Sequence, residues 1–279
     1  MICSFTAESW VILSPIEQSI KAKIEAIGVP LKNWDIQINY GIKTGYNEAF
    51  IISGEKRKEL IEQDPKSAEI IRPILRGRDI KRYGYEFADL WLINTHNGIR
   101  EKGIKPINID DYPAIKNHLD KFYPELEKRL DKGITPYNLR NCAYIEDFSK
   151  QKIVYIEIMT DNPKEGYDFP AFSFDSMGCI CLNTAYIMTG DIQELKYILA
   201  VLNSKLGKQL VKFYVTQLQN RQFRMLHQSV KNFPIPKANM EIKQQIEEAL
   251  QEQDYQKIDN LVYEMYHLSE EEIHCVENQ

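Results

Sequence analysis

The sequence has 279 residues, of which 43% are hydrophobic and 27% are charged. That length allows a buried core in one or two domains. It contains no run of eighteen apolar residues, which excludes a membrane-spanning helix. The first residues show no basic segment ahead of an apolar stretch, so we expect no secretory signal. The five cysteines follow no regular spacing, which favours reduced thiols in a cytoplasmic protein; they are Cys3, Cys142, Cys179, Cys181 and Cys275.

The formal net charge of −5 is unevenly distributed along the chain. Residues 241–279 hold eleven acids and two bases, so this segment carries −9 and residues 1–240 carry +4. Charge asymmetry of this kind indicates a body with an anionic partner. A solvated acidic helical end is the alternative explanation, and composition alone does not separate the two.

In the first half of the chain, the patterns predict helices and strands in alternation. Ser14, Pro15 and Glu17 form a capping-box sequence that starts a helix, and Gly28 with Pro30 ends it. Period-two alternation predicts a strand over 34–40, followed by a glycine-bounded turn over 41–47. We further expect a strand over 49–52, helices over 53–63 and 66–75, a buried strand over 90–93, a loop over 94–111, and a helix from Pro113 to Leu130 kinked at Pro124.

In the second half, strands are predicted over 152–158, 171–174, 179–182 and 185–188, and then the period becomes helical. An apolar stripe predicts one long helix over 191–213, and the sequence Phe-Pro-Ile-Pro at 233–236 ends the body of the fold. Helices follow over 240–252 and 254–268, with a last one from Ser269. The fold class is therefore α+β (mixed α/β), divided into an N-terminal linker helix (1–30), a body (31–236) and acidic C-terminal helices (237–279).

Motifs for catalysis are missing from the sequence. There is no glycine-rich nucleotide loop, no nucleophile elbow and no His-Glu-x-x-His zinc motif. The Asn-Pro-Pro-Tyr motif of adenine methylases is absent, and Glu157 lacks the lysine two residues later that a metal-dependent nuclease uses. Cys179 and Cys181 have no second pair to complete a zinc site. We therefore predict no catalytic residue, no metal and no cofactor in this chain.

Two segments are strongly basic. Residues 72–82 hold five bases and one acid, and residues 205–224 hold five bases and no acid, together with Gln217, Gln219, Asn220 and Gln222. Arginine beside asparagine and glutamine is the set that contacts guanine and adenine edges, and nearby lysines suit phosphates. A solvated helix face is the alternative for either segment alone; two such segments favour nucleic acid.

Two pieces of the sequence are distinctive: Gly-Ile-Lys-Thr-Gly-Tyr-Asn-Glu-Ala-Phe-Ile at 41–51 and Ile-Arg-Pro-Ile-Leu-Arg-Gly-Arg-Asp-Ile-Lys-Arg-Tyr at 71–83. Seven further pieces lie at 112–115, 133–140, 152–155, 199–205, 233–236, 258–266 and 269–273. Taken in order, these nine pieces resemble the TaqI-like C-terminal specificity domain, which follows the methyltransferase domain in adenine-N6 methylases and fused restriction–methylation enzymes. The resemblance covers nearly the whole chain.

This resemblance implies a DNA target-recognition domain with a twisted sheet and flanking helices, forming one wall of a cleft for the duplex. The partners it implies are double-stranded DNA and a methyltransferase or nuclease domain or subunit, and no membrane. S-adenosylmethionine, with magnesium for a nuclease, would belong to the full enzyme. Because the chain starts where the linker helix would, we expect a split gene or a shortened chain that is not an enzyme on its own.

The residues expected to contact DNA fall into three main segments, Lys43–Asn47, Arg76–Arg82 and Gln219–Arg224. Gly41 and Gly45 would let the backbone approach DNA, and one of the arginines at 76–78 would read a guanine. Alternatives remain, because Arg78 with Asp79 could be a structural ion pair and Tyr137 with Arg140 could be buried scaffold. The complete set of expected DNA-binding residues is Lys43, Thr44, Asn47, Arg76, Arg78, Lys81, Arg82, Tyr137, Arg140, Gln219, Asn220, Arg221 and Arg224.

Two other functions compete with DNA recognition. The acidic helices from residue 241 could dock onto a catalytic subunit, which would make the chain a protein–protein module. An endonuclease with an unrecognised site is the third possibility. Deletion of 241–279 tests the second, and plasmid cleavage with magnesium tests the third.

Overall fold

Two four-stranded sheets form the centre of the protein, as seen in a computed structural model that describes residues 13–162 and 168–278. Residues 1–12, which include Cys3 and belong to the predicted linker segment, lie outside the described residues. The first sheet is antiparallel, because each strand pairs with its neighbour in reverse. Its order is β2 (Ile36–Tyr40), β10 (Ala185–Gly190), β6 (Lys152–Ile156) and β8 (Phe172–Asp175). The inner strands β6 and β10 are almost wholly buried, as their apolar and β-branched residues require.

The second sheet has the order β3 (Ile51–Ser53), β5 (Leu90–Ile93), β4 (Ile71–Leu75) and β9 (Ile180–Cys181). Here β4 and β9 run parallel, whereas the other pairs are antiparallel. Strand β9 lies between β8 and β10 in the sequence, so the chain leaves the first sheet, adds an edge strand to the second and returns. This exchange holds the two sheets together.

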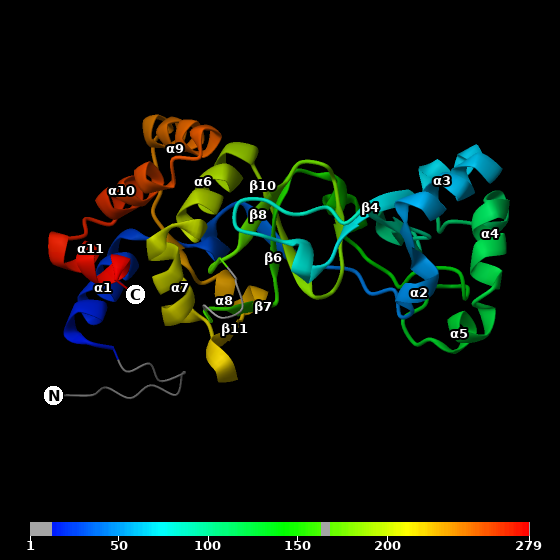
Figure 1. Ribbon diagram of the computed structural model, residues 1–279, viewed down its shortest axis with the longest axis horizontal. Coiled ribbons are helices and arrows are strands. Elements are labelled where there is room, and N and C mark those ends of the chain that lie inside the picture. The colour runs from blue at the N-terminus through cyan, green and yellow to red at the C-terminus, as the bar shows by residue number, and fades with distance from the viewer. Residues whose placement is uncertain (1–12, 163–167, 279) are drawn as a thin grey trace.

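Helices cover the two sheets separately, which gives the molecule two ends (Figure 1). Around the second sheet lie α2 (Asn47–Phe50), α3 (Gly54–Gln63), α4 (Pro113–Asp120) and α5 (Tyr123–Lys128). Around the first lie α1 (Pro15–Ile27), α6 (Ile192–Asn203), α7 (Lys205–Tyr214), α8 (His227–Val230), α9 (Met240–Glu252), α10 (Tyr255–Met265) and α11 (Glu270–Glu277). Between them, the segment after β4 crosses back toward β8 and α6.

Short elements complete the fold. Two small antiparallel pairs join β1 (Val29–Pro30) to β12 (Pro234–Ile235), and β7 (Ile158–Thr160) to β11 (Gln222–Arg224). Single 3-10 turns lie at η1 (Leu31–Asn33), η2 (Pro65–Glu69), η3 (Gly77–Asp79), η4 (Arg100–Lys102), η5 (Ile109–Asp111), η6 (Ile145–Ser149) and η8 (Gln219–Arg221).

The predicted α+β class is confirmed, and several elements match closely. The capping box at Ser14 and Glu17 makes both of its hydrogen bonds. Helices α9, α10 and α11 start within a residue of their predicted positions. They contact α1, α6 and α7, so they cover the first sheet's helical layer. The three-part division at residues 30 and 236 stays a prediction.

Four element predictions were wrong. Residues 66–75 are not a helix, because η2 is followed by β4, whose Ile-Arg-Pro-Ile-Leu sequence pairs with β5 and β9. The predicted strand over 49–52 begins as α2. The helix from Pro113 breaks fully between α4 and α5, and Leu130 is 98% exposed. The helix over 191–213 breaks at Ser204. Within the described ranges, no helix has the length and apolar character needed to cross a bilayer.

Candidate nucleic-acid interface

A groove of about 720 Å3 lies between the two sheets and gathers residues from distant parts of the chain. One side is formed by α2, β3 and β5, and the other by β6, β7 and the turn between β9 and β10. Its lining residues are Asn47, Glu48, Ile51, Arg76, Gly77, Arg78, Leu90, Ile156, Glu157, Ile158, Leu182 and Thr184. Three residues of the expected DNA-binding set, Asn47, Arg76 and Arg78, therefore line one cavity.

Arg76 is partly buried and forms an ion pair with Asp79. Its Nη2 lies 2.7 Å from Asp79 Oδ1, and its Nε lies 3.0 Å from Oδ2. The Asp79 carboxylate also accepts the Arg76 backbone N–H at 2.8 Å and is only 4% exposed. The hydrogen bond that the Arg76 guanidinium donates to Asp79 is the main cause that raises the pKa of Arg76. The alternative prediction of an ion pair between Arg78 and Asp79 is therefore wrong, because Asp79 pairs with Arg76 instead.

Arg78 is the exposed arginine of this turn. Throughout 13–162 and 168–278, no residue forms a hydrogen bond or ion pair with its side chain. The short 3-10 turn η3 directs Arg76 toward Asp79 and leaves Arg78 on the rim of the groove. A guanidinium without an internal partner is available for a ligand with paired acceptors.

The segment 41–47 follows β2 and passes beside the groove. Gly41 is required by internal packing, because a Cβ there would lie 2.0 Å from the Leu182 carbonyl oxygen. Gly45 has a φ of +72° and faces Arg129 and Asp131. For Gly41, which is buried, the expectation of close approach to DNA is wrong, because this glycine serves packing within the protein. For Gly45, which is exposed, it stays a prediction.

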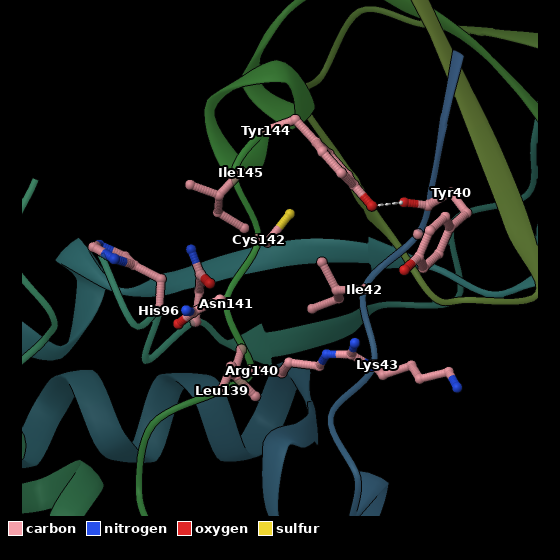
Figure 2. A pocket seen from close by; sticks show the side chains of 12 residues that line it. Tyr40, Ile42, Lys43, His96, Leu139, Arg140, Asn141, Cys142, Tyr144 and Ile145 are labelled. Atoms are coloured by element: carbon pink, nitrogen blue, oxygen red, sulfur yellow. Dashed lines mark hydrogen bonds between the residues drawn. The ribbon is translucent and has the colours of Figure 1, made fainter. Parts of the chain in front are cut away.

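The polar residues of this segment differ in exposure. Thr44 is 2% exposed; its hydroxyl donates to the Asn47 side chain and accepts the Tyr46 N–H at 3.2 Å. Lys43 and Asn47 are exposed. Arg140 lies next to Lys43 in a second, smaller cavity (Figure 2), where its Nη1 is 3.1 Å from Asp131 Oδ1. Arg140 is exposed, so the alternative of a buried scaffold role is wrong for it.

The third expected segment forms a tight hairpin loop between α7 and β11. Leu218 N–H donates to the Gln222 carbonyl at 2.7 Å, and Arg224 N–H donates to Thr216 at 3.1 Å. At its tip, η8 exposes Gln219, Asn220 and Arg221. Asn220 and Arg221 both have a φ of +58°, a left-handed conformation that is uncommon without glycine. Such conformations persist where the surrounding structure enforces them, and they cluster at functional sites.

Arg224 joins this loop to the groove. Its Nε donates to Glu157 Oε1 at 3.0 Å, and Glu157 is a groove residue. Glu157 directly precedes β7, and Arg224 is opposite the first residue of β7, Ile158, in the β11–β7 register. All three expected segments therefore meet at or beside one groove.

Asp161, which directly follows β7, forms ion pairs with three bases. Its carboxylate lies 2.6 Å from Arg221 Nη2, 3.1 Å from Lys208 Nζ and 3.8 Å from Lys212 Nζ. Partial burial acts to raise the pKa of Asp161, but the hydrogen bonds from Arg221 and Lys208 outweigh it, so the pKa is lowered. Three cations thus share the Asp161 carboxylate, which ties α7 and the η8 loop to the end of β7.

Three expected residues make internal contacts away from the groove lining. Arg82 donates to the Asn203 carbonyl at the end of α6. Lys81 is exposed and lies 3.8 Å from Glu86. Tyr137 donates to the Asp120 carboxylate; partial burial is the main cause that raises the pKa of its hydroxyl.

The ion pairs of Glu157 and Asp161 were not predicted from the sequence. These two acids flank β7; Glu157 was considered only as a nuclease carboxylate, and Asp161 carried no motif. Their partners are 67 and 60 residues away in the sequence, and no local signal predicts that β7 pairs with β11. Over the described ranges, no group of three histidine, cysteine or acidic side chains is arranged to hold a metal ion.

Comparison with known proteins places this geometry in context. Residues 72–235 match the TaqI-like C-terminal specificity domain. The chain is 22% identical over 283 residues to the type II methyltransferase M.BstVI of Geobacillus stearothermophilus, covering 97% of this chain and 46% of that protein. It is also 22% identical over 282 residues to the type II methyltransferase M.PaeR7I of Pseudomonas aeruginosa, covering 95% and 44%. The chain thus spans less than half the length of these relatives.

The fold is similar to part of a solved structure, the type IIL restriction-modification enzyme MmeI in complex with DNA. The TM-score is 0.62 at 15% sequence identity, over 90% of this chain and 36% of that one. This likeness shows a shared fold. The match at 72–235 covers more than half of the chain, and it includes the groove arginines, β7 and the loop before β11. The chain therefore belongs to the TaqI-like C-terminal specificity domain family.

Proposed function

We propose that this chain is the DNA-reading part of a restriction-modification methyltransferase and that it binds double-stranded DNA over the groove between its two sheets. The observation that carries the proposal is the position of Arg78, an exposed guanidinium without an internal partner on the rim of a groove in a specificity-domain fold. A groove of about 720 Å3, open between two sheets, can receive the edge of a duplex.

The residues around the groove suit different parts of DNA. Arg78 fits guanine, whose O6 and N7 accept two hydrogen bonds from one guanidinium. Arg224 is oriented by Glu157 through its Nε, which leaves its terminal nitrogens for a second base or a phosphate. Lys43 and Arg140 suit phosphates, because both are exposed cations that line a neighbouring cavity. Arg221, at the exposed tip of the η8 loop, is a further candidate for a phosphate contact.

Methyl transfer is assigned to another part of the complete enzyme. The two curated relatives are methyltransferases, and this chain matches less than half of each. We therefore propose that S-adenosylmethionine binds a separate methyltransferase domain or subunit, and that this chain selects the DNA sequence without catalysis of its own.

Selection from a pool of random duplexes tests DNA recognition. The chain is expected to enrich a defined sequence at low salt. Binding to that sequence should weaken steeply as salt rises, because each phosphate contact releases counterions. Recovery of unselected sequences after several rounds at low salt would contradict the proposal.

Arg78→Ala provides the residue-level test. On the enriched duplex, binding is expected to weaken by roughly 1–3 kcal/mol, the value of one bidentate contact with guanine. The loss should be confined to one base pair, measured by anisotropy on duplexes varied at each position. The control is Lys121→Ala, which removes an exposed charge at the end of α4 outside the groove lining. Equal losses in the two variants would assign Arg78 a general electrostatic role.

A further inference from the structure

The groove arginine Arg78 lies at one end of a small hairpin whose other end reaches the C-terminal helices. In this hairpin (residues 79–86), Glu86 N–H donates to the Asp79 carbonyl and Lys81 N–H to the Gly84 carbonyl, both at 2.8 Å. Ile80 and Tyr85 form an antiparallel bridge between its two arms. Because these bonds join the arms, the hairpin moves as one piece.

The base of the hairpin is part of the groove. The Arg76–Asp79 ion pair closes the turn just before it, and Arg78 lies within that turn. A rotation of the hairpin about this base would therefore change the direction of the Arg78 side chain relative to the groove.

The tip of the hairpin is bound to β8. Tyr83 N–H donates to the Phe172 carbonyl at 2.8 Å, and Phe174 N–H donates to the Tyr83 carbonyl at 3.4 Å. Ser173 Oγ lies within hydrogen-bonding distance of the Lys81 and Gly84 carbonyls. Tyr83 has a φ of +67°, an unfavourable conformation for an aromatic residue that the surrounding contacts must maintain.

The same tip also touches the C-terminal helices. The ring of Tyr83 stacks on Tyr255, the first residue of α10, with centroids 4.4 Å apart and planes 9° from parallel. Tyr255 is 37% exposed, so its ring closes over Tyr83 from the solvent side. Arg82 lies over the Tyr83 ring and donates to the Asn203 carbonyl.

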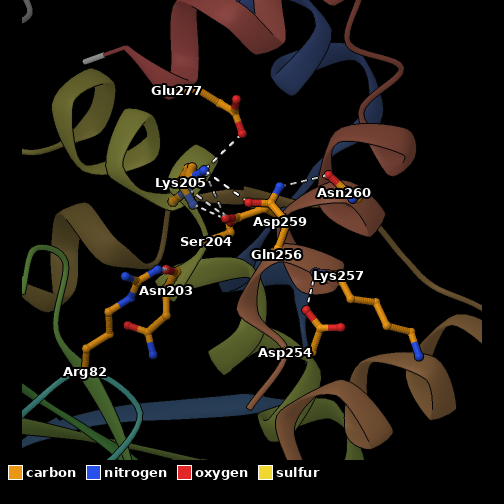
Figure 3. Close-up of polar contacts among 11 residues, drawn as sticks. Arg82, Asn203, Ser204, Lys205, Asp254, Gln256, Lys257, Asp259, Asn260 and Glu277 are labelled. Carbon is orange, nitrogen blue, oxygen red and sulfur yellow. Dashed lines mark hydrogen bonds and ion pairs between the residues drawn. The ribbon is translucent and has the colours of Figure 1, made fainter. Parts of the chain in front are cut away.

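Near Arg82, helix α10 is held by a hydrogen bond with the start of α7 (Figure 3). Asp259 of α10 accepts the Lys205 backbone N–H at 2.8 Å, at the start of α7. Asn203, the last residue of α6, bonds the Phe172 backbone in both directions, at 2.8 and 3.0 Å. The hairpin tip is therefore enclosed by β8, the α6–α7 joint and α10.

We propose that the C-terminal helices position the DNA-reading arginine: Tyr255 and Arg82 hold the hairpin tip and thereby set the orientation of Arg78 at the groove. This inference rests on the proposed function for its consequence in DNA reading, but the mechanical coupling is independent of it. A change that displaces α10 from Tyr83 would therefore also alter base selection by Arg78, although Arg78 and Tyr255 are 177 residues apart in the sequence.

Tyr255→Ala tests the coupling in the full chain. Amide hydrogen exchange in residues 79–86 is expected to accelerate about tenfold in this variant, because the hairpin tip loses a packed partner. Preference for the enriched duplex over its variant at the base pair assigned to Arg78 should fall about tenfold. Affinity for unrelated duplex should stay unchanged, since the phosphate contacts lie elsewhere.

Three further variants separate positioning from general stability. Tyr255→Phe keeps the stacked ring and is expected to behave as the unaltered protein. Tyr255→Leu keeps apolar bulk without stacking, and serves if the alanine variant folds poorly. Asn260→Ala changes an exposed residue of α10 that contacts Gln256 rather than the hairpin, and is expected to leave both exchange and preference unaltered.

The outcomes distinguish this inference from the proposed function. If the unaltered chain selects a sequence, but Tyr255→Ala and Tyr255→Leu retain both preference and slow exchange, the positioning role is overturned. If the unaltered chain selects no sequence, DNA reading fails, and accelerated exchange of 79–86 alone still supports the mechanical coupling. A lower melting temperature with unchanged exchange and preference would mean that Tyr255 is only structural, which also overturns the inference.

Discussion

At the scale of single residues, the buried guanidinium of Arg129 organises the segments on one side of the groove. Arg129 is 7% exposed and donates to four carbonyls, those of Thr44, Asp131, Pro136 and Asn138. It also stacks over Phe50, 4.5 Å from the ring centroid. Burial lowers its pKa to about 10, so it stays charged at neutral pH. One side chain thus joins the Lys43 segment to the loop that carries Arg140.

Arg129→Lys is expected to destabilise the protein. An ammonium group has only three N–H donors and cannot reach four carbonyls, so at least one acceptor would lose its partner. Each buried group left unsatisfied costs about 1–3 kcal/mol, and the urea midpoint should fall accordingly. Arg100→Lys, at an exposed arginine of η4, is the control. Equal midpoints for the two variants would show that the four bonds do not stabilise the fold.

Residue identity alone could not assign these arginines their roles. The basic segment 72–82 was visible in the sequence, but which arginine faces Asp79 depends on the 3-10 turn η3, which places Arg76 against the carboxylate. Likewise, nothing in the sequence separates Arg82 from the other bases of this segment, yet its side chain bonds the end of α6 and lies over the Tyr83 ring at the hairpin tip. Arg129 carried no local signal, because its partners are carbonyls rather than side chains.

At the scale of elements, helix starts with capping sequences were predicted correctly, whereas strands defined by long-range pairing were not. The start of α1 and of α11 follow from local hydrogen bonds, which the sequence contains in full. Strand β4 was mistaken for a helix, since Ile70, Ile71, Ile74 and Leu75 also fit a helical stripe. What makes it a strand is pairing with β5 and β9, and β9 lies about a hundred residues later. Tertiary pairing decides such ambiguous apolar runs.

The break between α6 and α7 gives an element-scale prediction. Ser204 is fully buried; its hydroxyl accepts the Gly207 N–H at 3.0 Å and donates to the Val201 carbonyl at 2.7 Å. Ser204→Ala is therefore expected to cost about 1–2 kcal/mol of unfolding free energy in urea titrations. Ser176→Ala, at an exposed serine outside any helix, should change it by less than about 0.5 kcal/mol. No difference between the variants would refute a capping role for Ser204.

At the scale of the whole molecule, the acidic C-terminal helices neutralise bases of the body. Glu247 of α9 pairs with Lys196 of α6, and Glu277 of α11 lies 2.9 Å from Lys205. Such partly exposed pairs contribute little stability, but they place the negative C-terminal end away from the groove and beside α6 and α7. That the body binds an anionic partner, as the charge asymmetry indicates, stays a prediction. Docking of these helices on a catalytic subunit stays a prediction.

The two ends of the described chain meet at Glu272, which joins α11 to α1. This carboxylate is 3% exposed and accepts hydrogen bonds from Lys23 Nζ at 2.6 Å, from Ser19 Oγ at 2.7 Å and from the Ser269 N–H at 2.7 Å. Burial acts to raise its pKa, but the Lys23 bond and the two others outweigh burial and lower the pKa from 4.5 to about 2. The carboxylate is thus favoured in the folded protein.

The depressed pKa of Glu272 predicts a specific acid dependence of stability. A carboxyl whose pKa is lower in the folded state stabilises fully above its unfolded value of 4.5, and this contribution disappears as pH falls from 4.5 toward 2. The loss should amount to about 3 kcal/mol of unfolding free energy. Glu272→Gln cannot titrate, so it should be less stable than the unaltered protein at pH 6 and should approach it at pH 2–3. Urea titrations across this range measure the gap. A gap that stays constant from pH 6 to pH 2 would mean that the ionised carboxylate of Glu272 does not hold α1 and α11 together.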